Sequence, residues 1–181
     1  MKVERKVRIE TDRLQIGDQI KVKFSGEKHK ATAIRREDDG MLFLLDDCLD
    51  RAMPMNENGG TKGGYDASDL RQYLVKKASE IPMKLQDRMV AFENGDYLRL
   101  LTLEEACGVD ADFSDTGGQI EWMKDRRHRV TMRKDNEYAS WWLRGVVSAS
   151  LFANVAYNGY ALSGSASSSI GVRPAFKIRD L

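Results

Sequence analysis

Two histidines, His29 and His128, are the side chains best suited to act as a general base in nucleophilic hydrolysis. Each lies among cations, in Glu-Lys-His-Lys and Arg-Arg-His-Arg, and neighbouring positive charge opposes protonation of an imidazole. The serines within 163–169 are clustered and do not form the Gly-x-Ser-x-Gly turn that presents a catalytic serine. The sequence therefore predicts no catalytic residues, and we expect that the protein is not an enzyme.

An acidic segment resembles a metal site. Asp110, Asp112, Ser114 and Glu121 match positions 1, 3, 5 and 12 of the calcium-loop template. The sixth position of that template needs glycine for a sharp turn, and here it is Asp115. We therefore favour an acidic, solvated loop, keep calcium as the alternative, and expect neither a metal nor a cofactor.

A basic run, Lys124-Asp-Arg-Arg-His-Arg129, is followed by Arg133 and Lys134 and could hold phosphates. The formal net charge of the whole chain is only +1, and exposed aromatic residues do not alternate with these cations as they do in nucleic-acid-binding surfaces. The run is better explained as a solvated loop that pairs with nearby acids. We expect no nucleic-acid partner.

Between Arg144 and Arg173 the chain has no charged residue, although 31% of all its residues are charged. Residues 145–172 contain seven Ser, five Ala and four Gly, with aromatic and aliphatic residues spread among them. This pattern predicts short strands and tight turns. A segment that crosses the core is the alternative, but so many buried hydroxyls would lack hydrogen-bond partners. An uncharged surface of Tyr, Phe, Asn and Ser indicates a binding site.

The remaining sequence predicts a mixture of strands and helices that would position this surface. Alternation of apolar and polar residues predicts strands, and apolar residues at helical spacing after a capping residue predict helices. Cys48 and Cys107 lie in different neighbourhoods, so we expect buried thiols rather than a disulfide or a zinc site. The predicted strands are 19–24, 31–34, 41–45, 97–101 and 172–178; segment 31–34 is expected to pair with 19–24, and Pro174 is expected at an edge or bulge. The predicted helices are 70–81, capped by Asp66 or Ser68, and 103–107.

Three segments carry a family resemblance: Trp142-Leu-Arg144, Val155-x-x-x-Gly159 and Gly171-Val-Arg-Pro-Ala-Phe176. They resemble the carboxy-terminal signature of a bacterial and phage family with a C-type-lectin-like fold, which includes target proteins of diversity-generating retroelements. The chain departs from the family at Gly145-Val146, where Ser or Ser-Pro is usual. The resemblance implies an α+β, C-type-lectin-like fold of mixed short strands with two or so helices. It implies one domain over 1–181, with 141–178 as the variable display region.

The resemblance also divides the carboxy-terminal region into a framework and a display surface. Arg144 and Arg173 are expected to anchor the display loops through backbone carbonyls, because arginine offers several donors in a fixed fork. Residue types in 145–172 all have codons ending in a pyrimidine, as mutation of adenines in asparagine codons would produce. The framework would be Trp141, Trp142, Leu143, Val155, Gly159, Gly171, Val172, Pro174 and Phe176, and the ligand-binding residues would be Ser148, Ser150, Phe152, Asn154, Ala156, Tyr157, Tyr160, Leu162, Ser163, Ser165, Ser167 and Ser168.

The functional hypothesis is a ligand- or receptor-binding protein, either a retroelement-diversified target protein or a phage tail-associated adhesin. The expected partner is a protein or cell-surface ligand, with a homo-oligomer left open. A structural or assembly module of a prophage or cell-surface complex is the alternative, and an enzyme related to the formylglycine-generating proteins ranks last. We expect synthesis in the cytoplasm, function on a virion or cell surface, and no membrane partner, because no apolar run approaches the ~20 residues of a transmembrane helix.

Overall fold

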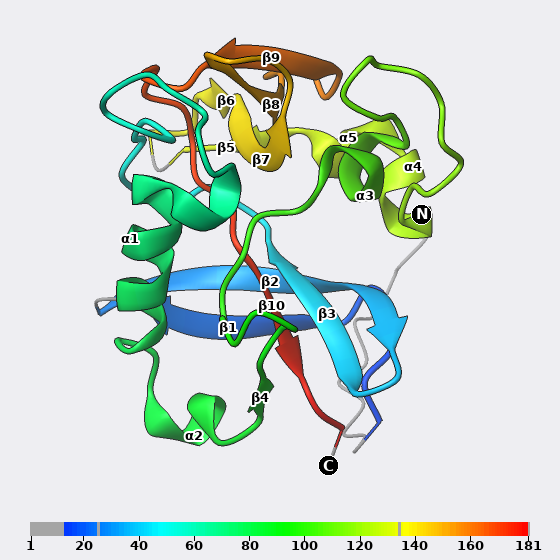
Figure 1. Cartoon of the computed structure of the whole chain (residues 1–181). Coiled ribbons are helices and arrows are strands. Elements are labelled where there is room, and N and C mark those ends of the chain that lie inside the picture. The colour runs from blue at the N-terminus through cyan, green and yellow to red at the C-terminus, as the bar shows by residue number, and fades with distance from the viewer. Residues whose placement is uncertain (1–12, 25, 134, 181) are drawn as a thin grey trace.

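The computed structural model describes residues 13–24, 26–133 and 135–180, and over these residues the protein is a mixed α+β structure rich in antiparallel sheet (Figure 1). Five strands of the described residues form a lower sheet with the order β1-β2-β3-β10-β4. The helix α1 lies along one side of this sheet, and α2 lies at its lower end (Figure 1). The bounds are β1 Gln19–Phe24, β2 Glu27–Glu37, β3 Gly40–Leu45, β4 Met89–Val90, β10 Ala175–Ile178, α1 Asp69–Ala78 and α2 Met83–Gln86.

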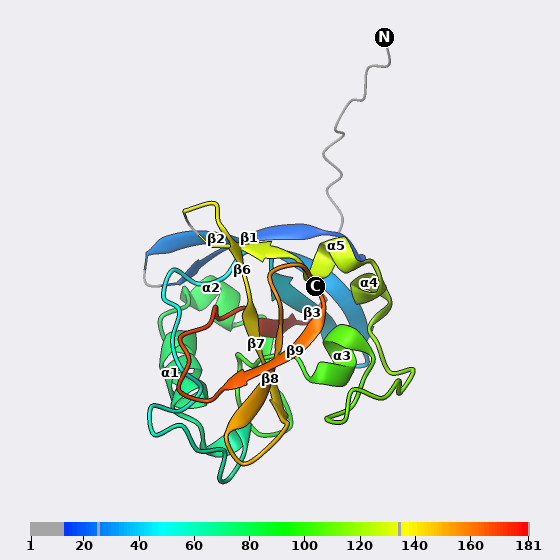
Figure 2. The same cartoon turned by 90° about the horizontal axis from the view of Figure 1, so that it is seen from above.

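A smaller upper sheet has the order β7-β8-β9 and carries most of the uncharged stretch. Seen from above, it crosses the top of the molecule between α1 on one side and α3, α4 and α5 on the other (Figure 2). A short hairpin, β5–β6, follows α5 along the chain and precedes β7. The bounds are β7 Trp141–Val146, β8 Leu151–Val155, β9 Ala161–Ser165, β5 Thr131–Met132, β6 Tyr138–Ala139, α3 Leu103–Cys107, α4 Glu121–Lys124, α5 Arg126–Arg129 and a single 3-10 turn at Tyr65–Ala67.

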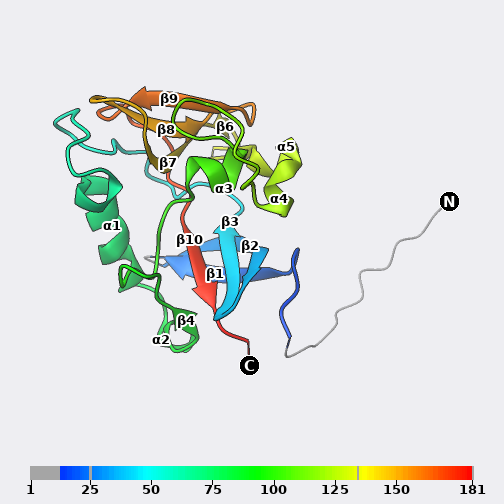
Figure 3. The ribbon, with the colours of Figure 1, turned by 45° about the vertical axis from the view of Figure 1, so that its right-hand side comes forward.

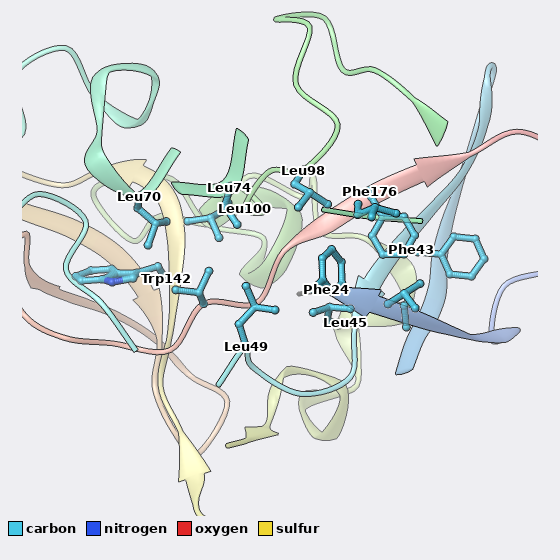
Figure 4. Packing of buried hydrophobic residues seen from close by; sticks show 14 of the residues in the cluster. Phe24, Phe43, Leu45, Leu49, Leu70, Leu74, Leu98, Leu100, Trp142 and Phe176 are labelled. Atoms are coloured by element: carbon cyan, nitrogen blue, oxygen red, sulfur yellow. The ribbon is translucent and has the colours of Figure 1, made fainter. Parts of the chain in front are cut away.

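The core lies on both faces of β3, whose six residues are all buried. Phe43 packs with Phe176 on one face, while Leu42 and Leu44 face a second apolar cluster on the other. Trp142 of the upper sheet belongs to the same cluster as Phe43, so one continuous apolar core joins the two sheets (Figure 4).

The strand predictions for the first part of the chain are confirmed. β1 pairs antiparallel with β2, as predicted for 19–24 and 31–34, and Ile20 lies opposite Ala31. Both predicted helices form, but α1 ends at Ala78 and does not reach Ile81 as predicted. The Ser68 hydroxyl accepts a 3.1 Å hydrogen bond from the Arg71 amide at the start of α1. The Thr102 hydroxyl and the Glu105 carboxylate form a capping box at the start of α3.

Three local predictions are wrong. Residues 97–101 form only an isolated bridge, in which Arg99 exchanges two backbone hydrogen bonds with Ala175, because β4 occupies that edge of the sheet. Pro174 precedes β10 rather than lying within it, and β10 is an inner strand rather than an edge. The basic run pairs with nearby acids as predicted, Arg127 with Asp125 and Arg133 with Asp135, but most of it is not a loop and forms the helical turns α4 and α5.

The connection from β9 to β10 ties the upper sheet to the lower one (Figure 3). Gly171 donates to the carbonyl of Ser140 and accepts from the amide of Trp142, at 3.0 Å in both cases. Further along, the carbonyl of Val172 accepts from Leu49. Within the described residues, no helix is long and apolar enough to span a bilayer.

Candidate ligand-binding face

The upper sheet displays several of the predicted ligand-binding residues to solvent. Tyr157, Tyr160 and Leu162 are 60%, 56% and 51% exposed, which is unusual for side chains of this size. Ser163 and Ser165 of β9 are half-buried. We define the display face as the exposed members of the predicted set: Ser148, Ser150, Tyr157, Tyr160, Leu162, Ser167 and Ser168.

Three other predicted ligand-binding residues are buried, so the prediction that they face a ligand is wrong. Phe152, Asn154 and Ala156 are only 0%, 1% and 9% exposed. Phe152 and Asn154 lie in β8, the central strand of the upper sheet, which is covered on both of its faces, and Ala156 directly follows this strand. Phe152 packs into the same core cluster as Trp142.

Asn154 is an unusual buried residue. Its amide Oδ1 has no hydrogen-bond partner among the described residues. A Cβ atom placed on Gly164 would lie 3.0 Å from the amide Nδ2 of Asn154, so the glycine lets β9 pass closely over the amide. Asn154 belongs to the frame beneath the display face rather than to the face itself.

The predicted anchoring role of Arg144 and Arg173 is also wrong. Arg173 donates to two backbone carbonyls, those of Leu45 at 2.6 Å and His128 at 3.0 Å, but neither lies in the display region. Its burial lowers the pKa of the guanidinium to about 10. The Arg144 side chain is half-buried, its Nε has no hydrogen-bond partner among the described residues, and burial lowers its pKa.

The turn that carries the two display tyrosines is held instead by the basic run. Arg129 donates from Nε to the carbonyl of Gly159 at 2.7 Å, and its own carbonyl accepts a 2.8 Å bond from the indole of Trp141. Arg126 donates to the carbonyl of Asn158 at 3.3 Å. The sequence analysis missed this role, because a side chain that bonds to a backbone carbonyl some 30 residues away leaves no local pattern.

Gly159 lets this turn approach α5 closely. Its φ of +85° lies in the left-handed region, and a Cβ there would lie 2.9 Å from the backbone carbonyl oxygen of Arg126. The framework role predicted for Gly159 thus has a physical reason. The Arg126 guanidinium also lies over the ring of Tyr160, 4.8 Å from its centroid, which orients that tyrosine.

A groove of about 580 Å³ borders the display face between α5, the β5–β6 hairpin and the β8–β9 turn. Tyr138 and Met132, on the side of the groove formed by the hairpin, are 64% and 39% exposed. Among the residues that the structure describes, no acidic side chain lines the groove. Its lining residues are Arg126, Arg127, Val130, Met132, Tyr138, Tyr157 and Asn158. The display face therefore continues into an aromatic, cationic depression that the sequence did not reveal.

The acidic segment 110–121 has its own hydrogen bonds. The Asp110 carboxylate accepts from the backbone amides of Asp112 and Ser114 at 2.9 and 3.0 Å. Glu121 starts α4 and pairs with Lys124 at 2.6 Å. Among the described residues, no three acidic, histidine or cysteine side chains are grouped as metal ligands would be.

Residues 93–180 match the model of a family described as a domain of unknown function (DUF6273). The matched segment begins after Phe92 and contains α3, α4, α5, the whole upper sheet and β10. No curated protein and no solved structure matches the chain. The display face and the cationic turns that support it thus lie together inside the matched segment.

Proposed function

We propose that this chain is a ligand- or receptor-binding protein with a C-type-lectin-like fold, which binds through the display face. The observation that carries the proposal is the exposure of Tyr157, Tyr160 and Leu162, each more than half exposed, within a segment that contains no charged residue. Tyrosine offers a large contact area at low entropic cost, and the surrounding serines offer adaptable hydrogen bonds. The C-type-lectin-like assignment is supported by the short antiparallel strands of the structure and by burial of framework residues such as Trp142 and Phe176.

Rigid support of these side chains strengthens the proposal. The turn between β8 and β9 is fixed by hydrogen bonds from Arg126 and Arg129, and Tyr160 is stacked against Arg126. Side chains that are already ordered lose less entropy when they bind.

The test is selection of binders from a random peptide library displayed on phage, with the purified protein as the target. We expect enriched peptides whose binding falls at least tenfold on Tyr157→Ala or Tyr160→Ala. Tyr97→Ala is the matched control, because Tyr97 is 45% exposed and lies outside the display face. Peptides that bind equally to all variants, or no enrichment at all, would overturn the proposal. Melting temperatures of the two variants near that of the parent protein exclude a general loss of fold.

We further propose that the chain is a diversified target protein or a phage tail-associated adhesin. Support comes from the family resemblance and from the residue types of 145–172, all of which have codons ending in a pyrimidine. The test is the surrounding DNA: we expect a reverse-transcriptase gene and an imperfect, adenine-rich copy of codons 141–178. Absence of both would contradict diversification and leave the binding proposal standing.

An assembly module is the second candidate, and the edge strand β9 favours it. β9 ends the order of the upper sheet, and Ala161–Ser165 contains neither a charge nor a proline to discourage pairing with another strand. A single species of about twice the chain mass of 20.5 kDa in light scattering at micromolar concentration would support this candidate. A monomer at the same concentration favours a free display face.

A further inference from the structure

We propose that the groove beside the display face binds an acidic peptide segment of the partner. In this arrangement a carboxylate pairs with Arg126, and an apolar side chain lies against Tyr138 and Tyr157. The proposal rests on the proposed function, because the groove shares Tyr157 with the display face.

Arg126 is the cation that is available to a ligand. It is exposed, and it makes no ion pair with any described residue. Its one side-chain hydrogen bond goes to the carbonyl of Asn158 at 3.3 Å, which leaves further N–H groups of the guanidinium free to donate. Stacking on Tyr160 holds the guanidinium plane in place. A preorganised fork of this kind favours a carboxylate, which accepts two parallel hydrogen bonds.

The other described cations near the groove already have partners. Arg127 pairs with Asp125 through both carboxylate oxygens, and this contact lowers the pKa of Asp125. Arg129 donates to the carbonyls of Gly159 and Met123. Arg133, on the far side of the hairpin, pairs with Glu137 at 2.7 Å. Arg126 is therefore the described cation of the groove that remains to pair with a negative charge on the ligand.

The surroundings of the groove carry an excess of positive charge. Residues 124–137 contain six lysines and arginines against three aspartates and glutamates, and residues 145–172 add no charge of either sign. Both described acids of the hairpin segment, Asp135 and Glu137, lie within ion-pair distance of Arg133. A partner with negative charge would complement this side of the molecule, and like charge would be repelled.

The same features favour a peptide over a nucleic acid. A nucleic-acid surface neutralises several phosphates at once, whereas this groove offers one unpaired guanidinium among tyrosine, methionine and valine side chains. The formal net charge of +1 gives little long-range attraction to a polyanion. A peptide that combines one or two acids with an apolar or aromatic residue matches both parts of the lining.

The experiment extends the peptide selection. We expect the enriched peptides to contain more Asp and Glu than the unselected library. One such peptide, labelled with fluorescein, is then titrated by anisotropy beside a version in which Gln replaces Glu and Asn replaces Asp. Because Arg126 also supports Tyr160 and the β8–β9 turn, Arg126→Gln can weaken both peptides, but it should weaken the acidic peptide roughly tenfold more than the neutral version. Lys76→Gln is the control, since it removes one exposed positive charge from α1, away from the groove.

A second variant separates the effect of the positive charge from the effect of the guanidinium geometry. Arg126→Lys keeps the charge but loses the fork, so its affinity should lie between those of the parent and Arg126→Gln. The preference for the acidic peptide should also shrink between 50 and 500 mM NaCl, because salt screens exposed charges. Equal weakening by Gln and Lys, or equal weakening of acidic and neutral peptides, would overturn the proposal.

Failure of this inference can be told apart from failure of the proposed function. Peptides that depend on Tyr157 and Tyr160 but not on Arg126 overturn the acidic groove and leave the binding function intact. Peptides whose binding depends neither on the two tyrosines nor on Arg126 overturn both the acidic groove and the binding function. A single-stranded DNA 20-mer that binds in an Arg126-dependent manner more tightly than the acidic peptide overturns the peptide assignment in favour of a nucleic acid.

Discussion

The indole nitrogen of Trp142 donates a 2.9 Å hydrogen bond to the backbone carbonyl of Met53, 89 residues earlier in the chain. The same carbonyl accepts from the amide of Ile170. Trp142 thus links the first strand of the upper sheet to the loop before α1 and to the segment that leads into β10. The upper sheet rests on this residue, which is fully buried.

Trp142→Phe should destabilise the protein by about 2 kcal/mol, because it removes a buried hydrogen bond and leaves a space where the larger indole lay. Urea denaturation monitored by circular dichroism measures the change. Tyr157→Phe serves as the control, since that side chain is exposed, and its free energy of unfolding should stay within about 0.5 kcal/mol of the parent value. An unchanged midpoint for Trp142→Phe would contradict the supporting role of the indole.

The close packing around Gly171 predicts that a side chain at this position destabilises the fold. A Cβ at this position would lie 2.6 Å from the Cys48 sulfur and 2.7 Å from the Ser140 carbonyl oxygen. Gly171→Ala should therefore cost about 2 kcal/mol or more. Gly145→Ala in β7 is the matched control, because its Cβ would meet nothing closer than 3.6 Å. Thermal denaturation of both variants distinguishes close packing at Gly171 from a general intolerance of alanine.

The lowered pKa of Glu105 predicts that the folded protein loses stability in acid. Burial alone raises the pKa of this carboxyl group, but the hydrogen bonds and charge of Arg99, the Thr102 amide and Arg35 outweigh burial and lower the pKa to about 2. Because the pKa is lower in the folded state, the contribution is present above the ordinary value of 4.5 and is lost as pH falls from there toward 2. At neutral pH this contribution of Glu105 to the free energy of unfolding is about 3 kcal/mol at most.

The measurement is urea denaturation of the parent and Glu105→Gln at several pH values. Glu105→Gln should be less stable at pH 7, and the two proteins should converge as pH falls below about 4. Glu104→Gln is the control, because Glu104 is the exposed neighbour in the same helix. A constant difference between parent and Glu105→Gln across the whole pH range would show that the ion pair is not the cause.

The two cysteines should be unreactive in the folded protein. Burial raises the pKa of both Cys48 and Cys107 to about 11, so only about 0.1% of each thiol is ionised at pH 8. Reaction with a disulfide reagent such as DTNB should be slow at pH 8 and fast in 6 M guanidinium chloride. Rapid reaction of either thiol without denaturant would contradict this prediction and would strengthen the case for an enzyme with a reactive cysteine.

Local patterns in the sequence predicted the elements that depend on neighbouring residues. The capping box of Thr102 and Glu105 and the alternation in Gln19–Phe24 hold in the structure because capping and pleating are set within a few residues. The strand predicted at 97–101 failed because pairing depends on which partner is free. β10 already has β3 and β4 as neighbours, and Arg99 reaches it only through Ala175.

The display surface was predictable in its polarity but not in its detail. Absence of charge between Arg144 and Arg173 marked the region, and Tyr157, Tyr160 and Leu162 are indeed exposed. Asn154 and Phe152 were misplaced because burial in a strand depends on what covers each face, and β8 is covered on both. The groove was missed because it forms where residues 126–138 meet the β8–β9 turn in space.

The bonds from Arg126 and Arg129 to the turn end on the carbonyls of Asn158 and Gly159. Every amino acid carries that carbonyl, so these bonds to the turn do not depend on the side chains at 157 or 158, whereas Arg126 also contacts the ring of Tyr160. Both arginines lie outside 145–172, so substitutions at the exposed positions 157 and 158 would leave the two bonds in place as long as Gly159 is kept. The path of this turn therefore depends on contacts to its backbone, and the chemistry of its exposed surface depends on the side chains that it carries.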